Sequence, residues 1–355
     1  MKDWHNLLLV LVTICCSCAP TSDTERIVSE FQEEGALIAK EHVISEPILL
    51  PRYIGISGNY LYVYKEREKN MFVLFRLSDL SYIIETGAKG QGPHDFNLVD
   101  TRSFTPTPDG FKVIEAGSGQ LKDVIISETG FQVRKSQRIF PKGVPSNGFY
   151  PISDSLYLSL GRMDGENEFT LINTQSENVT PIGSYPNWEG IMESDEFMPF
   201  IVFLKRCAVH PSQNKFASFY SRFKRFRIYD SDIKLLHDVN VQTEPCFTSF
   251  YDDPDKWPVY YLGEPYATQN LIFALCSYNR TKKEGNSELH VWDWEGNPIA
   301  CYSLGHSISL MTIDQQRGRV IAMDVMQDSI FYVYDLPENI RKLMSVPQYR
   351  NYRIT

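Results

Sequence analysis

The sequence predicts an all-β fold, a six-bladed β-propeller built from four-stranded antiparallel blades. Three observations predict it: a hairpin of apolar segments that recurs about every fifty residues, a second hairpin inside each repeat, and an extra apolar segment before the first repeat. Antiparallel four-stranded units can close into a ring that leaves only short, protected sheet edges. A β-sandwich needs no repeat of this length, and a parallel α/β fold needs helical spacing between strands, which this sequence lacks.

Two hairpins define each repeat. In the first, a turn rich in Gly, Pro, Asn, Asp or Ser precedes the second strand. These second strands are expected to begin at Leu61, Phe111, Leu156, Phe216, Leu271 and Val320. The turns of the second hairpins carry short polar side chains that can bond the backbone two residues further on. They are Ser78, Ser127, Asn173, Asp230, Asp293 and Asp335.

The last repeat supplies only three strands before Pro337 interrupts the pattern. We expect an N-terminal strand within Glu41 to Leu50 to supply the fourth and to close the ring. The propeller is therefore predicted to span residues 40–338. Residues 339–355 form a C-terminal tail that is locally basic, which is typical of a solvated chain end.

The N-terminal residues 1–17 have the features of a signal peptide. Lys2 precedes an apolar run from Leu7 to Ile14, which is too short to span a bilayer as a lasting helix. Small Ser17 and then Cys18 follow the run, and this arrangement resembles the lipobox of bacterial lipoproteins. The resemblance implies that Cys18 is the first mature residue and carries a lipid anchor. It implies a location in the cell envelope of a Gram-negative bacterium, in the periplasm or at the outer-membrane surface.

Residues 18–39 are polar and acidic, and we expect a tether with one turn of helix, in which Ile27 and Phe31 stand four residues apart. The whole chain carries a formal net charge of -9, which disfavours nucleic acid as a partner because a phosphate backbone would be repelled. Hydrophobic residues make up 43% of the chain, enough for a packed core.

Four cysteines fall in the body of the propeller: Cys207, Cys246, Cys276 and Cys301. Export would permit disulfides, and four cysteines allow three pairings that the sequence does not separate. Cys276 and Cys301 are expected on the second and fourth strands of one blade, too far apart to bridge across the intervening strand. Buried thiols are the default interpretation.

The glycine-rich segment from Gly87 to Phe96 follows the first repeat. Gly90, Gly92, Pro93 and Phe96 fit a G-x-G-P-x-x-F core, which resembles the segment between blades in six-bladed propellers of the NHL and TolB-like type. The resemblance implies a structural role, with glycines at positive φ where the chain crosses between blades and Phe96 packed between them. His94, in the same segment, is a candidate ligand-binding residue.

No motif in the sequence indicates catalysis or a cofactor. The histidines form no H-E-x-x-H motif or close pair, no G-x-S-x-G motif is present, and we expect neither a metal site nor a cofactor. His210 precedes Pro211 at an inner hairpin, where it could approach the central channel. Trp188, Trp257 and Tyr260 lie beside long insertions and could form a platform for a glycan or peptide, or pack between blades.

These observations favour a lipid-anchored propeller of the cell envelope that binds or scaffolds an unidentified glycan, peptide or protein. The ligand site would lie at the mouth of the channel. The alternative is an envelope enzyme, a lyase or glycan hydrolase, with its site in the same place. Titratable groups with perturbed pKa values inside the channel would favour an enzyme, whereas a sparsely charged channel would favour binding.

Overall fold

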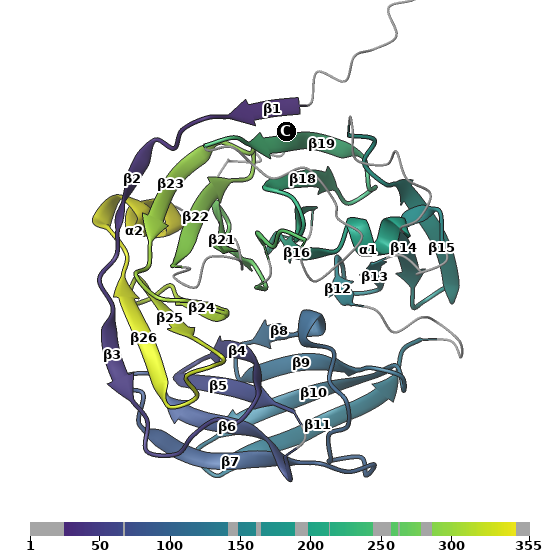
Figure 1. Ribbon diagram of the computed structural model, residues 1–355. Helices are drawn as coiled ribbons and strands as arrows, with labels where there is room; N and C mark the ends of the chain where they lie inside the picture. Colours follow the sequence, from purple (N-terminus) through teal and green to yellow (C-terminus); the bar gives the residue numbers. More distant parts are fainter. Residues whose placement is uncertain are drawn as a thin grey trace, which may run out of the picture.

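The computed structural model describes residues 25–66, 68–140, 148–160, 165–188, 198–212, 214–243, 257–261, 263–277 and 286–345. Within them, six sheets follow one another around a ring (Figure 1). Three sheets contain four consecutive antiparallel strands, two add a fifth, parallel strand from the N-terminal segment, and one contains three consecutive strands and a fourth from that segment. The predicted six-bladed β-propeller is therefore confirmed.

Blades I to III are antiparallel throughout, and their strands pair in chain order. Blade I contains β4 (Pro51–Ser57), β5 (Tyr60–Lys65), β6 (Asn70–Arg76) and β7 (Tyr82–Ala88). Blade II contains β8 (Thr105–Thr107), β9 (Gly110–Glu115), β10 (Gln120–Ser127) and β11 (Gly130–Arg138). Blade III contains β12 (Phe149–Pro151), β13 (Leu156–Leu160), β14 (Asn167–Asn173) and β15 (Asn178–Ser184).

Blades IV to VI repeat this pattern. Blade IV contains β16 (Lys205–Val209), β17 (Lys215–Tyr220), β18 (Arg225–Asp230) and β19 (Leu235–Val241). Blade V contains β20 (Tyr266–Ala267), β21 (Leu271–Ser277), β22 (Ser287–Asp293) and β23 (Pro298–Ser303). Blade VI contains β24 (Leu310–Asp314), β25 (Arg319–Met323) and β26 (Ile330–Asp335). In all six blades the second strand begins within one residue of its predicted start.

The ring is closed by β3 (Lys40–Val43), which pairs antiparallel with β26 so that Val43 lies opposite Ile330. This strand completes blade VI, as the leftover N-terminal segment predicted. Ahead of it, β1 (Glu25–Val28) and β2 (Glu33–Ala36) pair in parallel with β19 and β23, as fifth strands of blades IV and V. We call residues 25–43 the N-terminal strap, because they run along the outside of three blades (Figure 1).

The strap replaces the helical turn that we expected at Ile27 and Phe31. Both residues were assigned to one helical face, but Ile27 is 64% exposed, whereas Phe31 is 7% exposed and Val28 is 4% exposed. The physical reason is that β19 and β23 present unpaired backbone groups at the outer edges of their blades, and an extended segment can satisfy them. Part of the expected tether is therefore integral to the propeller.

In the turns of the second hairpins, polar side chains accept hydrogen bonds from the backbone, as predicted. The Asp230 carboxylate accepts hydrogen bonds from the N–H groups of Asp232 and Lys234, at 3.0 and 2.9 Å. The Asp293 carboxylate accepts from those of Glu295 and Asn297, at 2.9 and 2.8 Å. These side chains fix the loop geometry, and so the register of the strands on either side.

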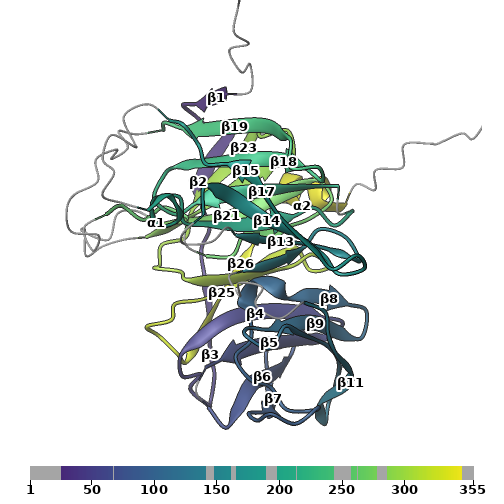
Figure 2. The same cartoon turned by 90° about the vertical axis from the view of Figure 1, so that its right-hand side faces the viewer.

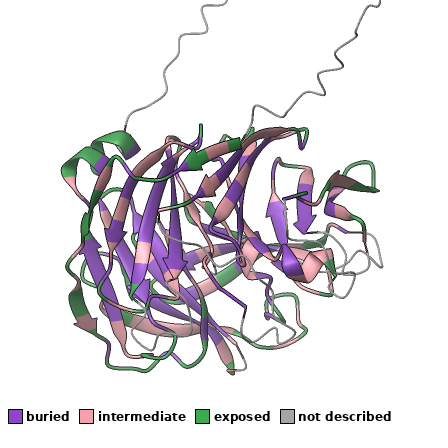
Figure 3. Cartoon of the chain, turned by 45° about the horizontal axis from the view of Figure 1, so that its top comes forward, coloured by how far each residue is buried: buried purple, intermediate pink, exposed green. Residues whose placement is uncertain are grey.

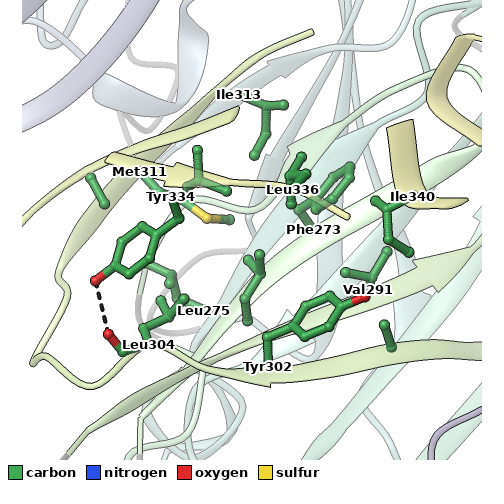
Figure 4. Close-up of a cluster of buried hydrophobic side chains, with 14 of the residues drawn as sticks. Phe273, Leu275, Val291, Tyr302, Leu304, Met311, Ile313, Tyr334, Leu336 and Ile340 are labelled. Atoms are coloured by element: carbon green, nitrogen blue, oxygen red, sulfur yellow. Dashed lines mark hydrogen bonds between the residues drawn. The ribbon is translucent and has the colours of Figure 1, made fainter. Parts of the chain in front are cut away.

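The core consists of apolar clusters between neighbouring blades, and buried residues fill the strands while exposed ones gather at turns and edges (Figure 3). The junction between blades V and VI also includes α2 (Glu338–Ser345), whose Ile340 is fully buried (Figure 4). This helix docks through Asn270, whose side-chain amide donates to the Leu343 carbonyl at 2.8 Å. The first part of the predicted tail thus packs on the propeller.

The other helical segments are the one-turn α1 (Pro199–Val202) and the 3-10 turn η1 (Thr101–Ser103). None of the helices in the described ranges is long and apolar enough to cross a membrane. Cys276 lies on β21 and Cys301 on β23, the second and fourth strands of blade V, as expected. Among the described residues, no disulfide joins Cys207, Cys276 and Cys301. Cys18, Cys246 and the signal peptide lie outside the described residues.

Candidate functional site

A cavity of about 420 Å³ occupies the centre of the ring, where the first strands of the blades meet. Figure 2 shows the ring from the side, with β1 at the top and blades I and II at the bottom. All six blades contribute to the lining of the cavity: Tyr53 from blade I, Phe104 and Thr105 from blade II, Tyr150 from blade III, Cys207 from blade IV, Tyr266 from blade V and Gln315 from blade VI. The volume falls within the range of small-molecule sites in proteins.

A charged cluster lies on the wall of this channel and is centred on Glu264, just before β20. The Arg206 Nε on β16 lies 3.1 Å from Glu264 Oε1, and the Tyr150 hydroxyl on β12 donates to Oε2 at 3.3 Å. The Arg102 Nε on η1 lies 3.9 Å from Oε1. Four blades thus bring one carboxylate and two guanidinium groups together.

Arg102 is held by its own turn. The Asp100 carboxylate accepts from the backbone N–H of Arg102 at 3.1 Å and from that of Phe149 at 2.7 Å, which ties η1 to β12. Burial raises the pKa of Asp100, although the nearby Arg102 charge opposes that shift. The Arg102 Nε atom is buried and has no hydrogen-bond acceptor among the described residues. The carboxylate of Glu264, at 3.9 Å, lies beyond hydrogen-bond distance of this Nε–H.

The phenols of the channel are held in their protonated form. Burial raises the pKa of Tyr150 well above its usual range, and Glu264 raises it further. Burial likewise raises the pKa values of Tyr53 and Tyr266. Tyr53 stacks on Phe104 with ring centroids 4.1 Å apart, and the Tyr266 hydroxyl accepts from the Gln315 amide at 3.1 Å. These groups offer aromatic faces and hydrogen bonds, and none of the three phenols carries a charge near neutral pH.

His210 lines the channel, as its position before Pro211 suggested, but both ring nitrogens are engaged. Its Nδ1 accepts from the Ser212 N–H at 3.0 Å, so Nε2 carries the proton and donates to the Gln269 carbonyl, also at 3.0 Å. Burial lowers the pKa of His210. The imidazole is therefore a neutral part of the wall.

The aromatic residues from the insertions lie elsewhere. Trp188 and Trp257 are 7% and 2% exposed and share a cluster beside blade IV. The Trp188 indole N–H donates to Asp238 at 2.9 Å, and the Arg225 guanidinium lies 4.0 Å from its ring centroid. Tyr260 is partly buried, and its backbone N–H donates to the Ser221 carbonyl. The burial of both indoles favours the packing interpretation.

The glycine-rich segment connects blades I and II. Phe96 is 1% exposed and meets Phe72 edge to face at 5.0 Å. Gly87 has a positive φ of 71°, but Gly90 and Gly92 do not. At those two positions a Cβ would instead lie 2.2 and 2.8 Å from the Asp95 carboxylate, so any larger residue would make the Asp95 side chain move. Pro93 and His94 are exposed on this loop, and neither lines the channel.

Four residues of the charged cluster were not predicted from the sequence: Arg102, Arg206, Tyr150 and Glu264. Each lies within or just before a short first strand, where a charged or aromatic residue looks like an ordinary strand or turn residue. One signal was available: Asp100 and Ser103 flank Arg102 in a pattern typical of a capped turn. Only the closed ring brings the four residues together.

No protein-family model matches the chain, and a search of curated proteins gave no match. Solved structures of similar fold include a candidate exported protein from Bacteroides fragilis NCTC 9343, with a TM-score of 0.52 and 10% identity over 88% of this chain and 100% of that one. Another is a member of the DUF4221 family from Bacteroides vulgatus ATCC 8482, with a TM-score of 0.52 and 10% identity over 83% and 98%. These similarities show the propeller fold. The TolB-like resemblance stays a prediction.

Proposed function

We propose that this chain is a lipid-anchored propeller of the cell envelope that binds a small carboxylate-bearing ligand in its central channel. The observation that carries the proposal is Arg102, a channel guanidinium whose buried Nε has no hydrogen-bond acceptor among the described residues and has Glu264 only as a more distant ion-pair partner, at 3.9 Å. A buried polar group of this kind is costly unless a partner satisfies it.

The hydrogen bonds around Arg102, and not a surplus of positive charge in the cluster, favour a carboxylate ligand. Glu264 is already held by Arg206 and by the Tyr150 hydroxyl, and Asp100 uses both oxygens on backbone N–H groups. Arg102 therefore keeps hydrogen-bonding capacity that its neighbours do not use. A guanidinium offers a planar fork that matches the two oxygens of a carboxylate.

The aromatic residues that line the channel indicate what the ligand carries besides its carboxylate. The stacked pair of Tyr53 and Phe104 and the ring of Tyr266 provide flat apolar surface around the charged cluster. Such surfaces suit a sugar ring or a short peptide. A uronic acid and a peptide C-terminus share the carboxylate, and the experiment below separates them.

The channel contains titratable groups with shifted pKa values, which the sequence-based criterion counts in favour of an enzyme, so the preference for binding rests on the partners that these groups already have. A lyase or glycan hydrolase needs a group that takes up or gives a proton near the working pH. In the described part of the channel, the phenols stay protonated, His210 is neutral with both nitrogens engaged, and Glu264 is paired with Arg206. The titratable groups expected of an enzyme are present, but each is already committed to a partner.

Calorimetry with sugars and peptides tests the proposed site. Wild-type protein is titrated with glucuronic acid, glucose, and a dipeptide with a free or an amidated C-terminus. We expect Arg102→Gln to weaken binding of the carboxylate ligand by about tenfold or more, because a hydrogen bond to a charged group contributes about 1.5–3 kcal/mol. Arg134→Gln is the matched control, since Arg134 is exposed on β11 of blade II and pairs with Asp109 and Asp123.

Binding of glucuronic acid but not glucose would assign a sugar acid, and binding of the free but not the amidated dipeptide would assign a peptide terminus. The channel site would be refuted if Arg102→Gln and Arg134→Gln lost the same affinity for the ligand. It would also be refuted if charged and neutral ligands bound equally well.

The anchor rests on the sequence around Cys18, and the similarity in fold to a candidate exported protein supports export. Cys18→Ala should remove the acylated residue and shift the protein from the membrane fraction to the soluble one. Fractionation of cells that produce each form, with metabolic labelling by a fatty acid, measures this. Membrane association and labelling that persist in the variant would contradict the anchor.

A further inference from the structure

A second group of reactive side chains lies in blade V, away from the channel. Cys276 comes from β21, Glu288 and His290 from β22, and Cys301 from β23. Cys276 stands opposite Glu288, and His290 stands opposite Cys301. Residues that pair across antiparallel strands share a face of the sheet, as do residues two apart on one strand. All four side chains therefore lie on the same face of blade V.

Three of these side chains converge. One ligand atom each from Cys276, Glu288 and His290 lies within 4.8 Å of the others. The His290 Nε2 lies 3.0 Å from Glu288 Oε2, and the Cys301 thiol adjoins the same carboxylate. Thiolate, imidazole and carboxylate are the ligands that zinc takes in proteins, with metal–ligand distances near 2.0–2.3 Å. Small side-chain adjustments would bring the three atoms around one ion.

The histidine ring is already oriented. Its Nδ1 lies 3.0 Å from the Tyr261 hydroxyl, and Phe31 of the strap packs on the ring with centroids 4.9 Å apart. A second partner on the far nitrogen is the usual arrangement for a metal-binding histidine, because it fixes the tautomer and the ring plane. Here it directs Nε2 toward Glu288.

The site is shielded but reachable. His290 and Cys276 are 0% and 2% exposed, whereas the Glu288 side chain is 28% exposed. An ion would be excluded from most solvent and would enter past the carboxylate. This combination suits a structural site better than an open catalytic one.

We propose that Cys276, Glu288 and His290 bind a zinc-type divalent ion, and that Cys301, which lies outside this group of three but beside Glu288, moves in as the fourth ligand. Binding displaces the thiol proton of each coordinating cysteine to solvent. The ion ties three strands of blade V together beneath the N-terminal strap. Sequence spacing does not indicate the site, because its ligands meet through strand pairing.

Metal analysis with substitutions tests the site. Protein treated with EDTA is dialysed against zinc chloride, and bound zinc is measured by mass spectrometry; cobalt uptake is followed by thiolate-to-cobalt absorption. We expect one zinc per chain and a higher melting temperature with zinc than without. Cys276→Ser and His290→Gln should lose the zinc and the cobalt signal, and the buried-cysteine control Cys207→Ser should keep both.

Two further variants keep the test decisive if a buried substitution prevents folding. Glu288→Gln changes the most exposed ligand and should weaken zinc binding at least about tenfold, and Tyr261→Phe should weaken it by about tenfold through the histidine, as substitutions next to metal ligands do. Circular dichroism of the metal-free forms checks their fold. Wild-type protein without bound zinc, or zinc retained in both Cys276→Ser and Glu288→Gln, would overturn the proposal.

Discussion

Two junctions between neighbouring blades differ in the residues that they bury. One lies between blades V and VI, and the other between blades III and IV. Between V and VI the contacts are apolar, with Phe273, Tyr334 and Ile340 among them, and the strap crosses the outside from β2 to β3 (Figures 1 and 4). Between III and IV, Lys205 on β16 pairs with Glu168 on β14 at 3.1 Å, with side chains 4% and 0% exposed.

Aromatic groups complete this buried pair. The hydroxyls of Tyr220 and Tyr229 donate to the Glu168 carboxylate at 2.6 and 3.0 Å, and the Lys205 ammonium lies 5.0 Å from the Phe169 ring centroid. No described part of the N-terminal segment crosses this junction. Both junctions contain an apolar cluster. The junction between blades V and VI adds the strap on its outside, whereas the junction between blades III and IV adds a buried charge network, in which a missing partner would leave a buried charge uncompensated.

Removing the strap should have the largest effect. Deletion of residues 1–43 removes β3 and opens the ring at blade VI, so we expect the melting temperature to fall by about ten degrees or more. Deletion of residues 1–37 removes β1 and β2 but keeps β3, so it should lower the melting temperature by less. Calorimetry of both forms against the chain from residue 18 measures the difference. Equal melting temperatures for all three would contradict closure by β3.

Glu168→Gln should break the charged junction. The substitution leaves the Lys205 ammonium buried without its counter-ion, which typically destabilises a protein by about 3–5 kcal/mol. Asp335→Asn is the control, because Asp335 pairs with Lys40 of the strap where both side chains are largely exposed, and such pairs contribute about 1 kcal/mol or less. Chemical denaturation measures the free energy of unfolding that each of the two variants loses. A similar loss of unfolding free energy in the two variants would show that the buried pair does not stabilise the junction between blades III and IV.

Phe31→Ala tests the packing of the strap on blade V. Phe31 lies 4.9 Å from the rings of both His290 and Trp292, and its loss should cost about 3 kcal/mol, since truncation of a buried phenylalanine leaves a cavity. Ile27→Ala on the same strap should change stability by about 0.5 kcal/mol or less, because Ile27 is 64% exposed. If the denaturation curves of Phe31→Ala and Ile27→Ala coincided, Phe31 would not belong to the cooperative core.

The sequence predicted the features that are local. Strand starts, polar turns such as Asp230 and Asp293, and the borrowed closing strand follow from hairpin chemistry and a repeated length. The strap was not predicted, because Glu25–Val28 and Glu33–Ala36 are polar segments that become strands only where an exposed sheet edge pairs with them. Their partners lie about two hundred residues or more away in the chain.

The candidate sites depend on the same long-range geometry. Lys205 and Glu168 look like solvent-facing residues near strand ends, and their burial follows from the neighbouring blade. Arg102 and Glu264 approach each other only across the channel, and Cys276 approaches His290 through pairing of β21 with β22. His210 was placed correctly because its hairpin leads directly to the channel.

Amide hydrogen exchange of the full chain tests ring closure by the strap most directly. We expect the amides of Lys40–Val43 that pair with β26 to exchange as slowly as those of β25 and β26, because all three strands open only with the ring. Exchange of Lys40–Val43 at the rate of an unstructured chain end, with β25 and β26 still protected, would contradict ring closure by the strap.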